Sequence, residues 1–496
     1  MTAENSGYYA AFKAKDVRFD GRFFVGVAST GIYCRPICRA KLPKPANCTF
    51  FAAAAAAEQA GFRPCLLCRP ELAPGASHIE ATATLAEKAA DVLRENCGSN
   101  QSLQALSQKL GCTDRHLRRI FADRYHVSPT QYMQTCKLLL AKSLLTDTSL
   151  SVLDVAMASG FGSLRQFNAL FKKQYRLTPT ALRKESAGGR QAQTAVTVYL
   201  GYRAPYPWQQ MLDFLSARAI PGIESVSNSA YSRTVRIDFA EKETVGWLTV
   251  TKHPVKDLLC VTVSESLLTA LPHVLGKVRR LFDLDCDPVA IFEALSPMNT
   301  LHPDLCVLGT RLPGCFDGFE LAVRAVLGQQ ITVKAAKTLA GRLVMAYGAQ
   351  VQTDSPALTH VFPSPSEITA LGESIADHLG PLGITSARAN TILALAQAFE
   401  SGNIDFGFCQ NPEAEMQKLM AIRGIGSWTA QYIAMRAMAW PDAFLETDAA
   451  IKKVLAPLSQ KEMLKLAENW RPWRSYATMN LWNFIASEGD KNVLFG

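Results

Sequence analysis

The chain has 496 residues, of which 48% are hydrophobic and 19% charged, and its formal net charge is +9. This length exceeds what one hydrophobic core organises, so we expect three or four domains. No apolar run reaches the roughly 20 residues that a membrane helix needs, and the first residues lack an apolar signal core, which predicts a cytoplasmic protein without a membrane partner.

The charge is distributed unevenly along the chain. Residues 1–190 hold 26 Lys and Arg against 14 Asp and Glu, whereas residues 191–496 hold 26 against 29. A local positive field is typical of a surface that binds a phosphate backbone, because each neutralised phosphate releases condensed counterions. We therefore expect a partner with a phosphate backbone, the alternative being a basic surface that is only solvated.

Four cysteines near the N-terminus stand in two close pairs, in GIYCRPICRAK and GFRPCLLCRP. The chain has thirteen cysteines and no secretion signal, which disfavours a disulfide framework and favours metal or catalytic use. Two short-spaced pairs can close one tetrahedral thiolate site, so we predict one Zn²⁺ per chain. A purely structural zinc site and unligated core cysteines are the alternatives. The predicted ligands are Cys34, Cys38, Cys65 and Cys68.

Basic residues crowd these cysteines, and together they resemble the N-terminal domain of Ada-type adaptive-response regulators over residues 16–75. The resemblance implies irreversible methyl transfer from a DNA methylphosphotriester to one zinc-bound cysteine, here Cys34 in STGIYCRP. Lys41 stands where the family commonly has arginine, and a lysine cannot form the same bidentate contact. The residues expected to bind DNA are Thr30, Arg35, Arg39, Lys41 and Arg63. The run Ala52–Ala57 between the cysteine pairs is predicted to be helical, because alanine is the best helix former.

An internal repeat with an offset of 50 residues occupies residues 100–186. Each copy reads as helix, glycine-containing turn and helix, which is typical of a helix-turn-helix unit whose second helix enters the major groove. Residues 82–184, with the stretch GFGSLRQFNALFKKQYRLTP, resemble the DNA-binding domain of AraC-type transcription regulators. The resemblance implies binding to double-stranded promoter DNA at the bacterial nucleoid, transcriptional activation and contact with RNA polymerase. Base-contacting candidates are Arg115, His116 and Arg119 in the first copy and Ser163, Arg165, Gln166 and Asn168 in the second.

Two segments have the Gly, Pro, Ser and Gln content of linkers, at Glu71–Ser77 and Ser186–Thr194. Beyond the second, residues 197–206, 234–239 and 247–253 have strand patterns, whereas residues from about 316 onward have long helical periods. A small α/β region is therefore predicted to precede a mostly helical one.

The sharpest pattern is IRGIGSWTAQYIAMRAMAWPDAFLETDAAIKK. Gly424, Ile425 and Gly426 between helical segments predict a tight hairpin whose backbone N–H groups approach a DNA phosphate. An acidic residue, Asp448, follows 22 positions later. A GxG hairpin alone is weak evidence for a DNA-binding enzyme. A helix-hairpin-helix followed by a carboxylate is much rarer in sequences than the hairpin alone and is therefore stronger evidence. Asp448 as a simple helix N-cap is the alternative.

Residues about 194–490 resemble the 3-methyladenine DNA glycosylase II (AlkA-like) family of the helix-hairpin-helix superfamily. The resemblance implies that Asp448 is the catalytic carboxylate, that Gln330 is the wedge, and that an aromatic pocket holds the extruded base. Ala449 and Ala450 depart from the bulkier side chains of the best-known relatives, so the sequence does not define the range of lesions. The expected pocket residues, each of which could instead be core, are Phe214, Trp428, Tyr432 and Trp482.

Trp428 stands two residues after the hairpin, where relatives with lyase activity carry a Schiff-base lysine. We therefore predict hydrolysis of the glycosidic bond without strand cleavage. No cysteine follows Cys409, and no Pro-Cys-His-Arg motif is present, so neither an iron–sulfur cluster nor a methylguanine methyltransferase is expected. The competing hypothesis is a methylation-sensing transcription regulator whose C-terminal half only binds DNA.

Together these patterns predict a monomeric, multidomain α+β protein. The expected modules are a small α/β zinc-cysteine methyl-acceptor domain at 1–77, an all-α AraC-type double helix-turn-helix domain at 78–186, a linker at 187–193, a small α+β domain at 194–310 and a mostly α-helical helix-hairpin-helix glycosylase domain at 311–496.

Overall fold

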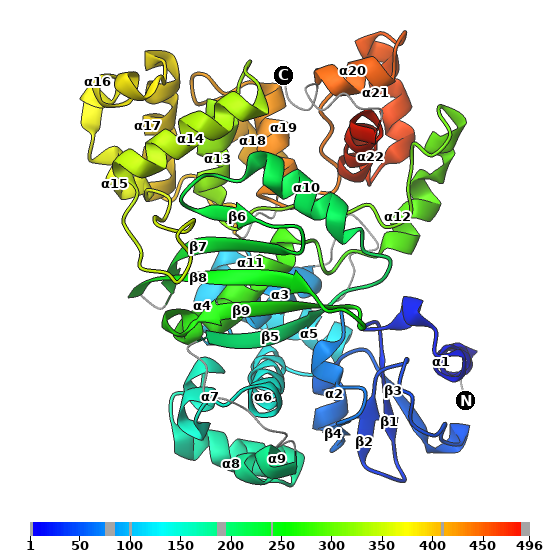
Figure 1. The fold of residues 1–496 in the computed structure, drawn as a ribbon. Helices are drawn as coiled ribbons and strands as arrows, with labels where there is room; N and C mark the ends of the chain where they lie inside the picture. The colour runs from blue at the N-terminus through cyan, green and yellow to red at the C-terminus, as the bar shows by residue number, and fades with distance from the viewer. Residues whose placement is uncertain are drawn as a thin grey trace.

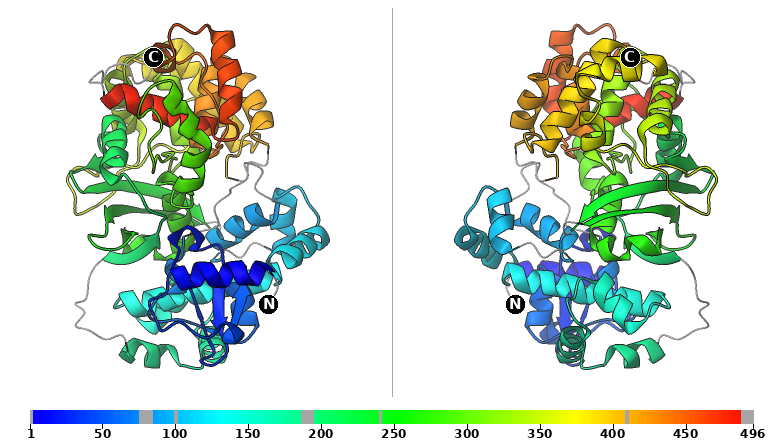
Figure 2. Two further views of the ribbon diagram at one scale, coloured as in Figure 1. Left: turned by 90° about the vertical axis from the view of Figure 1, so that its right-hand side faces the viewer. Right: turned by 90° about the vertical axis from the view of Figure 1, so that its left-hand side faces the viewer.

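The computed structural model describes residues 3–74, 85–98, 102–185, 195–239, 242–407 and 411–487. The N-terminal modules lie below a central antiparallel sheet and the C-terminal helices lie above it (Figures 1 and 2). The predicted linker at 187–193 lies outside the described residues. Within the described ranges, no helix combines the length and apolar character needed to cross a membrane.

The first module is a small sheet flanked by helices. Its strand order is β3-β1-β2-β4, with β2 and β4 parallel and the other neighbours antiparallel. The predicted alanine helix is confirmed, although it begins only at Ala54. The elements are α1 (Ala3–Ala14), β1 (Phe24–Val27), β2 (Ile32–Cys34), β3 (Cys48–Phe51), α2 (Ala54–Gln59) and β4 (Arg63–Pro64), with 3-10 helices η1 (Val17–Phe19), η2 (Pro45–Asn47) and η3 (Pro70–Leu72).

The second module is entirely helical in its described part, and the repeat predicted from the sequence is visible in its caps. Thr113 and Ser163, 50 residues apart, both cap the second helix of a unit, and His126 and Arg176 end those helices with φ of 57°. The helices are α3 (Leu85–Glu95), α4 (Leu103–Lys109), α5 (Asp114–Tyr125), α6 (Pro129–Asp147), α7 (Val152–Ala158), α8 (Leu164–Tyr175) and α9 (Pro179–Glu185). Helix α6 joins the two units.

Buried polar groups join the first two modules. Glu58 of α2 accepts hydrogen bonds from Tyr33 at 3.1 Å, from Thr135 of α6 at 3.0 Å and from Tyr175 of α8 at 3.4 Å. Glu71, which the sequence places in a linker, is buried and accepts from Lys142 of α6 at 2.6 Å. The segment after the last cysteine pair therefore begins as part of the packed structure.

The third module contains the antiparallel sheet of order β5-β9-β8-β7-β6. The strand predicted at 197–206 ends at Gly201, because Pro205 and Pro207 lie beyond it and lack the backbone N–H that a ladder needs. The elements are β5 (Ala195–Gly201), α10 (Trp208–Arg218), β6 (Glu224–Val226), β7 (Ala230–Phe239), β8 (Lys242–Lys252), β9 (Leu258–Ser264), η4 (Glu265–Ala270), α11 (Leu271–Leu281), α12 (Pro288–Leu295) and η5 (Ser296–Thr300).

The C-terminal module is a helical body around one continuous apolar core. Its elements are α13 (Gly318–Leu327), α14 (Val333–Tyr347), α15 (Pro365–Thr369), η6 (Gly372–Ser374), α16 (Ile375–Leu379), η7 (Gly380–Leu382), α17 (Ser386–Glu400), α18 (Pro412–Met420), α19 (Ser427–Arg436), α20 (Ala449–Val454), α21 (Gln460–Ala467), η8 (Glu468–Trp470) and α22 (Arg474–Ser487). The predicted fold class, a multidomain α+β chain with a mostly helical C-terminal domain, is confirmed; the module boundaries stay predictions.

Candidate functional site

The two cysteine pairs meet in one cluster. The sulfurs of Cys34, Cys38, Cys65 and Cys68 all lie within 4.8 Å of one another. The strands bring them together, because β2 ends at Cys34 and pairs with β4, which is followed directly by Cys65. Four converging thiols fit a tetrahedral metal site, and thiolates favour zinc.

A backbone amide also reaches this cluster, since the amide of Arg35 donates to Sγ of Cys68 at 3.3 Å. Cys34, Cys38 and Cys65 are buried and Cys68 is half-buried, so the cluster lies mostly inside the module.

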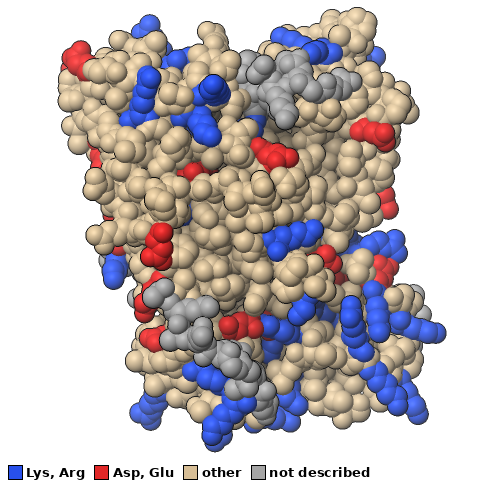
Figure 3. Space-filling view, in the orientation of Figure 1, with Lys and Arg blue, Asp and Glu red and all other residues tan. Residues whose placement is uncertain are grey.

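The basic residues around the cluster differ in accessibility. Arg39, Lys41 and Thr30 are exposed and Arg63 is half-buried, as a phosphate-binding surface needs. Arg35 is different, because its guanidinium donates to Asp20 at 2.9 Å and to the carbonyl of Cys68 at 3.2 Å. The structure therefore places Arg35 as a brace of the cysteine loop rather than as an open phosphate contact. Figure 3 shows Lys and Arg gathered over the lower, N-terminal part of this face.

The helix-turn-helix candidates lie on the outer sides of α5 and α8. Arg115, Arg119, Arg165, Gln166 and Asn168 are exposed and His116 is partly exposed. Ser163 is exposed and caps α8 by accepting from the amide of Gln166 at 3.2 Å. The residues with core spacing are buried, namely Leu117, Phe121, Phe167 and Phe171. On α5 and α8, the second helix of each unit, the side chains able to contact bases therefore lie on the side opposite to the buried core residues.

Asp448 is fully buried at the start of α20, where it is surrounded by hydrogen-bond donors. Its Oδ1 accepts from the amides of Ala450 at 3.0 Å and Ile451 at 3.2 Å and from Nε1 of Trp482 at 3.1 Å. Its Oδ2 accepts from Nε1 of Trp428 at 3.2 Å. Asp448 is therefore the N-cap that the alternative hypothesis described, with two indole donors that a cap does not require.

The predicted pocket aromatics gather beside this carboxylate. Trp428 and Tyr432 stack with ring centroids 5.2 Å apart and 8° between their planes, and Tyr432 lies 6.5 Å from Trp482. Phe214 is half-buried on α10 and packs against the same core. Trp482 is 1% exposed and belongs to the apolar core, as the alternative interpretation of this residue expects. The structure thus brings Asp448 and the four predicted aromatics into one region.

Two arginines that the sequence analysis missed line this region. The guanidinium carbon of Arg218 lies 3.7 Å from the ring centroid of Phe214, and Arg436 donates to the hydroxyl of Tyr432 at 2.7 Å. Burial raises the pKa of Tyr432, but the positive charges of Arg436 and Arg218 outweigh it and lower the pKa overall. Each arginine stands four residues after its aromatic partner on one helix, so spacing alone could have indicated both pairs.

The hairpin is joined to the turn that carries the predicted wedge. Gly424 has φ of 97°, and a Cβ there would lie 2.2 Å from the hydroxyl of Thr391, so only glycine fits. Gly424 and Gly426 are exposed, whereas Ile425 is buried and serves the core. Gln330 is exposed with φ of 55°. The preceding Gln329 donates from Nε2 to the carbonyl of Gly424 at 2.9 Å and to Thr429 at 3.0 Å.

Four family models match consecutive parts of the chain. They are the metal binding domain of Ada over residues 7–71, a helix-turn-helix domain over 106–185, the AlkA N-terminal domain over 197–317 and the HhH-GPD superfamily of base excision DNA repair proteins over 323–471. Their order along the chain is the order of the modules described above.

Individual relatives cover the whole chain or one part of it. DNA-3-methyladenine glycosylase 2 of Escherichia coli is 35% identical over 57% of this chain and 95% of its own length. The bifunctional transcriptional activator/DNA repair enzyme Ada of Escherichia coli is 35% identical over 24% of this chain and 33% of its own length. A protein of Mycobacterium tuberculosis named "Probable bifunctional transcriptional activator/DNA repair enzyme AlkA" is 38% identical over 96% of both chains. The chain therefore belongs to the family of this mycobacterial protein, and it joins an Ada-type metal-binding domain and a helix-turn-helix domain to an AlkA N-terminal domain and an HhH-GPD domain.

Proposed function

We propose that the C-terminal half is a DNA glycosylase that excises alkylated bases of the 3-methyladenine kind by hydrolysis, within a protein that also activates transcription. This proposal rests on the position of Asp448. Its carboxylate is fully buried beside four aromatic side chains, and it follows an exposed glycine hairpin in the chain. A carboxylate that only capped a helix would not need the indole donors of Trp428 and Trp482. These features disfavour a half that only binds DNA.

The geometry supports a simple chemical role for Asp448. When the bond between the base nitrogen and C1′ breaks, its electron pair leaves with the base and positive charge develops on the sugar. The fixed negative charge of Asp448 stabilises that charge, and its Oδ2, which accepts from Trp428, would orient water toward C1′ when the substrate is bound. The water oxygen bonds to C1′ and its proton passes to the carboxylate.

The deciding experiment compares the full chain with Asp448→Asn, which keeps the shape of the side chain and removes its charge. Duplex DNA carrying alkylated purines is incubated with each protein, and released base and strand breaks with and without alkali are measured. We expect the variant to lose about a hundredfold or more in excision rate while it still binds DNA.

The matched control is Asp317→Asn, because Asp317 caps α13 through the amide of Glu320 in the same way and lies outside the pocket. It should retain excision within a few-fold. Equal base release by wild type and Asp448→Asn would refute the assignment of the carboxylate. Strand breaks without alkali would refute hydrolysis as the only reaction, which we infer from Trp428 in place of a lysine.

We propose methyl transfer to Cys34 as a second activity, because the four cysteine sulfurs converge on one site and the exposed side chains of Arg39 and Lys41 belong to the same module. In this step the Cys34 sulfur bonds to the methyl carbon of a phosphotriester, the carbon–oxygen bond breaks, and its electron pair leaves with the phosphodiester oxygen. The sulfur loses its negative charge and the cysteine is not regenerated. A zinc ion held by the four cysteines would keep the thiols deprotonated, and Arg63, Arg39, Lys41 and Thr30 would hold the phosphate.

Loss of that charge lowers repulsion between this surface and DNA phosphates, so we propose that methylated protein binds its promoter more tightly. Peptide mass spectrometry after exposure to DNA with methylphosphotriesters should place the methyl group on Cys34. Cys34→Ala should abolish it, and Cys48→Ala, which changes a thiol outside the cluster, should not. A methyl group on Cys68 or Cys48 would contradict the proposal. RNA polymerase contact and the monomeric state stay predictions.

A further inference from the structure

The described residues fall into a regulator half, residues 3–185, and a glycosylase half, residues 195–487. These halves meet along an apolar surface. Helix α6 packs on β5, α7 on η4 and α3 on α11. Leu138 and Leu145 of α6 belong to the same continuous core as Val196 and Val198 of β5. The second helix-turn-helix unit and the sheet therefore share a core, as parts of a single domain do.

Buried polar contacts reinforce this surface. Glu95 of α3 forms an ion pair with Arg280 of α11, and Arg22 of the first module forms one with Asp287. Arg203, which is 5% exposed, donates to the backbone carbonyl of Asp20 at 3.1 Å. These contacts tie both modules of the regulator half, not only the nearer one, to the glycosylase half.

Two glycines of the glycosylase half sit where the regulator half approaches too closely for a side chain. A Cβ on Gly201 would lie 2.0 Å from the carbonyl oxygen of Leu72, and a Cβ on Gly276 would lie 2.3 Å from Cγ of Glu95. Gly201 ends β5 and Gly276 is inside α11, where glycine weakens regular structure without serving a turn. Their presence is explained by the close fit between the halves.

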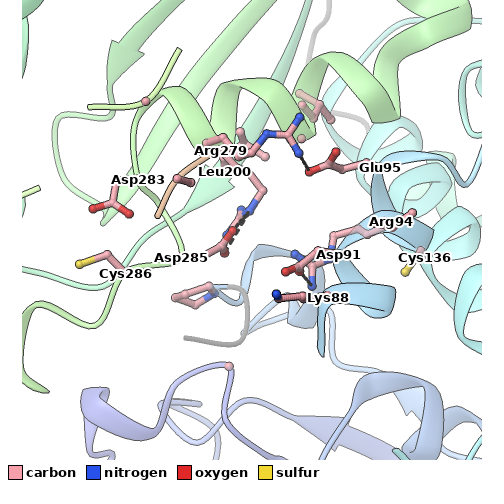
Figure 4. A pocket seen from close by; sticks show the side chains of 18 of the residues that line it. Lys88, Asp91, Arg94, Glu95, Cys136, Leu200, Arg279, Asp283, Asp285 and Cys286 are labelled. Atoms are coloured by element: carbon pink, nitrogen blue, oxygen red, sulfur yellow. Dashed lines mark hydrogen bonds and ion pairs between the residues drawn. The ribbon is translucent and has the colours of Figure 1, made fainter. Parts of the chain in front are cut away.

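A cavity lies between the halves and is lined by residues of both. It has a volume of about 840 Å³, and Figure 4 shows charged side chains of α3 facing those near the end of α11. These charges are mostly paired, Arg279 with Asp285, Arg280 with Glu95 and Arg94 with Asp91. We read the cavity as a hydrated part of the junction, because its charged walls already satisfy one another.

We propose that the two halves are held as one body by this interface itself, independently of the covalent linker between them. Domains joined by polar, modest interfaces move by default, whereas a large apolar interface holds them together. The partner that this face of the sheet fits is therefore the regulator half of the same chain. A consequence is that DNA bound by the helix-turn-helix units keeps the glycosylase at high local concentration on that DNA.

The test uses the full chain with residues 187–193 replaced by the recognition sequence of a specific protease. The protein is folded, cut at that site and analysed by size-exclusion chromatography, with the dissociation of the halves followed on dilution. We expect the cut halves to elute together as one species. Separate elution of the wild-type halves would overturn the proposal, whatever their activity, so this outcome is distinct from failure of the proposed glycosylase function.

Variants connect that result to the described contacts. Gly201→Val should weaken the association of the cut halves by at least about tenfold, because its side chain meets the Leu72 carbonyl. Gly380→Val, at an exposed glycine with open space around it, is the matched control and should not. Circular dichroism and cooperative thermal unfolding of the uncut Gly201→Val protein show that it has folded. Association of its cut halves as tight as in wild type would also overturn the proposal.

The ion pair provides a second set of variants, in which reversal of both charges tests the electrostatic part of the contact. Glu95→Arg should weaken the association, because it places a second positive charge beside Arg280. Adding Arg280→Glu should restore it by reversing the pair. Failure of the reversed pair to recover any association, with both proteins folded, would show that these two residues do not meet in solution and would count against the interface.

Discussion

Nε1 of Trp482 donates a hydrogen bond to Oδ1 of Asp448 at 3.1 Å, from a helix 34 residues further along the chain. Burial raises the pKa of Asp448, and the hydrogen bonds from Trp482, from Trp428 and from two backbone amides oppose that rise by favouring the charged form. The indoles therefore help to keep a fully buried carboxylate ionised, which is the state that the proposed chemistry requires.

Trp482→Phe should shift the acid limb of the excision rate to higher pH. Without the indole donor the charged form of Asp448 is less stable, so the pKa of the carboxyl rises further and activity is lost at a higher pH as the solution is acidified. The measurement is the pH profile of kcat/KM. Trp470→Phe, a buried tryptophan that packs on Phe444, is the control, and an acid limb that coincides for all three proteins would contradict this role.

Gln329→Met should slow excision from duplex DNA by about tenfold, since it removes two hydrogen bonds worth about 1 kcal/mol each at most. These bonds join the turn carrying Gln330 to the hairpin at Gly424, so their loss should impair base extrusion more than chemistry. Excision from a mismatched, already unstacked site should be affected less. Gln397→Met, an exposed glutamine on α17, should behave as wild type. Equal losses on paired and mismatched sites would argue for a merely structural effect.

Glu58→Gln should flatten the dependence of stability on pH. Burial raises the pKa of Glu58 to about 8, so the folded protein holds a proton that the unfolded chain has lost above its ordinary pKa of 4.5. The contribution of Glu58 to the free energy of unfolding therefore declines as pH rises from about 4.5 to about 8. Tm measured at intervals over that range should fall less steeply for the variant than for wild type and for Glu265→Gln, an exposed control. Parallel curves would exclude Glu58 as the source.

Protein purified without added metal should carry one zinc per chain, because the four sulfurs lie within 4.8 Å of one another. The double variant Cys65→Ala/Cys68→Ala should bring the zinc content close to zero. Cys112→Ala, at a cysteine of the helix-turn-helix module, should leave it unchanged. Elemental analysis decides the point, and zinc retained by the double variant would mean that it is bound elsewhere.

Features that are local in the chain could be predicted from the sequence alone. They are the cysteine spacing, the 50-residue repeat and the hairpin followed by Asp448, because short-range spacing dictates turn and ligand geometry. The caps at Thr113 and Ser163 were not predicted, and Ser163 was expected to contact bases. The aromatic pocket came from resemblance, and its members do lie together beside Asp448.

How distant segments complete those features follows from the packing of whole elements and could not be predicted. Trp482 reaches Asp448 from α22, Arg218 and Arg436 converge on the pocket from α10 and α19, and Arg35 turns to Asp20 instead of the solvent. The fit of Gly201 against Leu72 likewise joins segments with no pattern in common. Such contacts depend on how whole elements pack, and a one-dimensional pattern records which face of an element is buried but not what it is buried against.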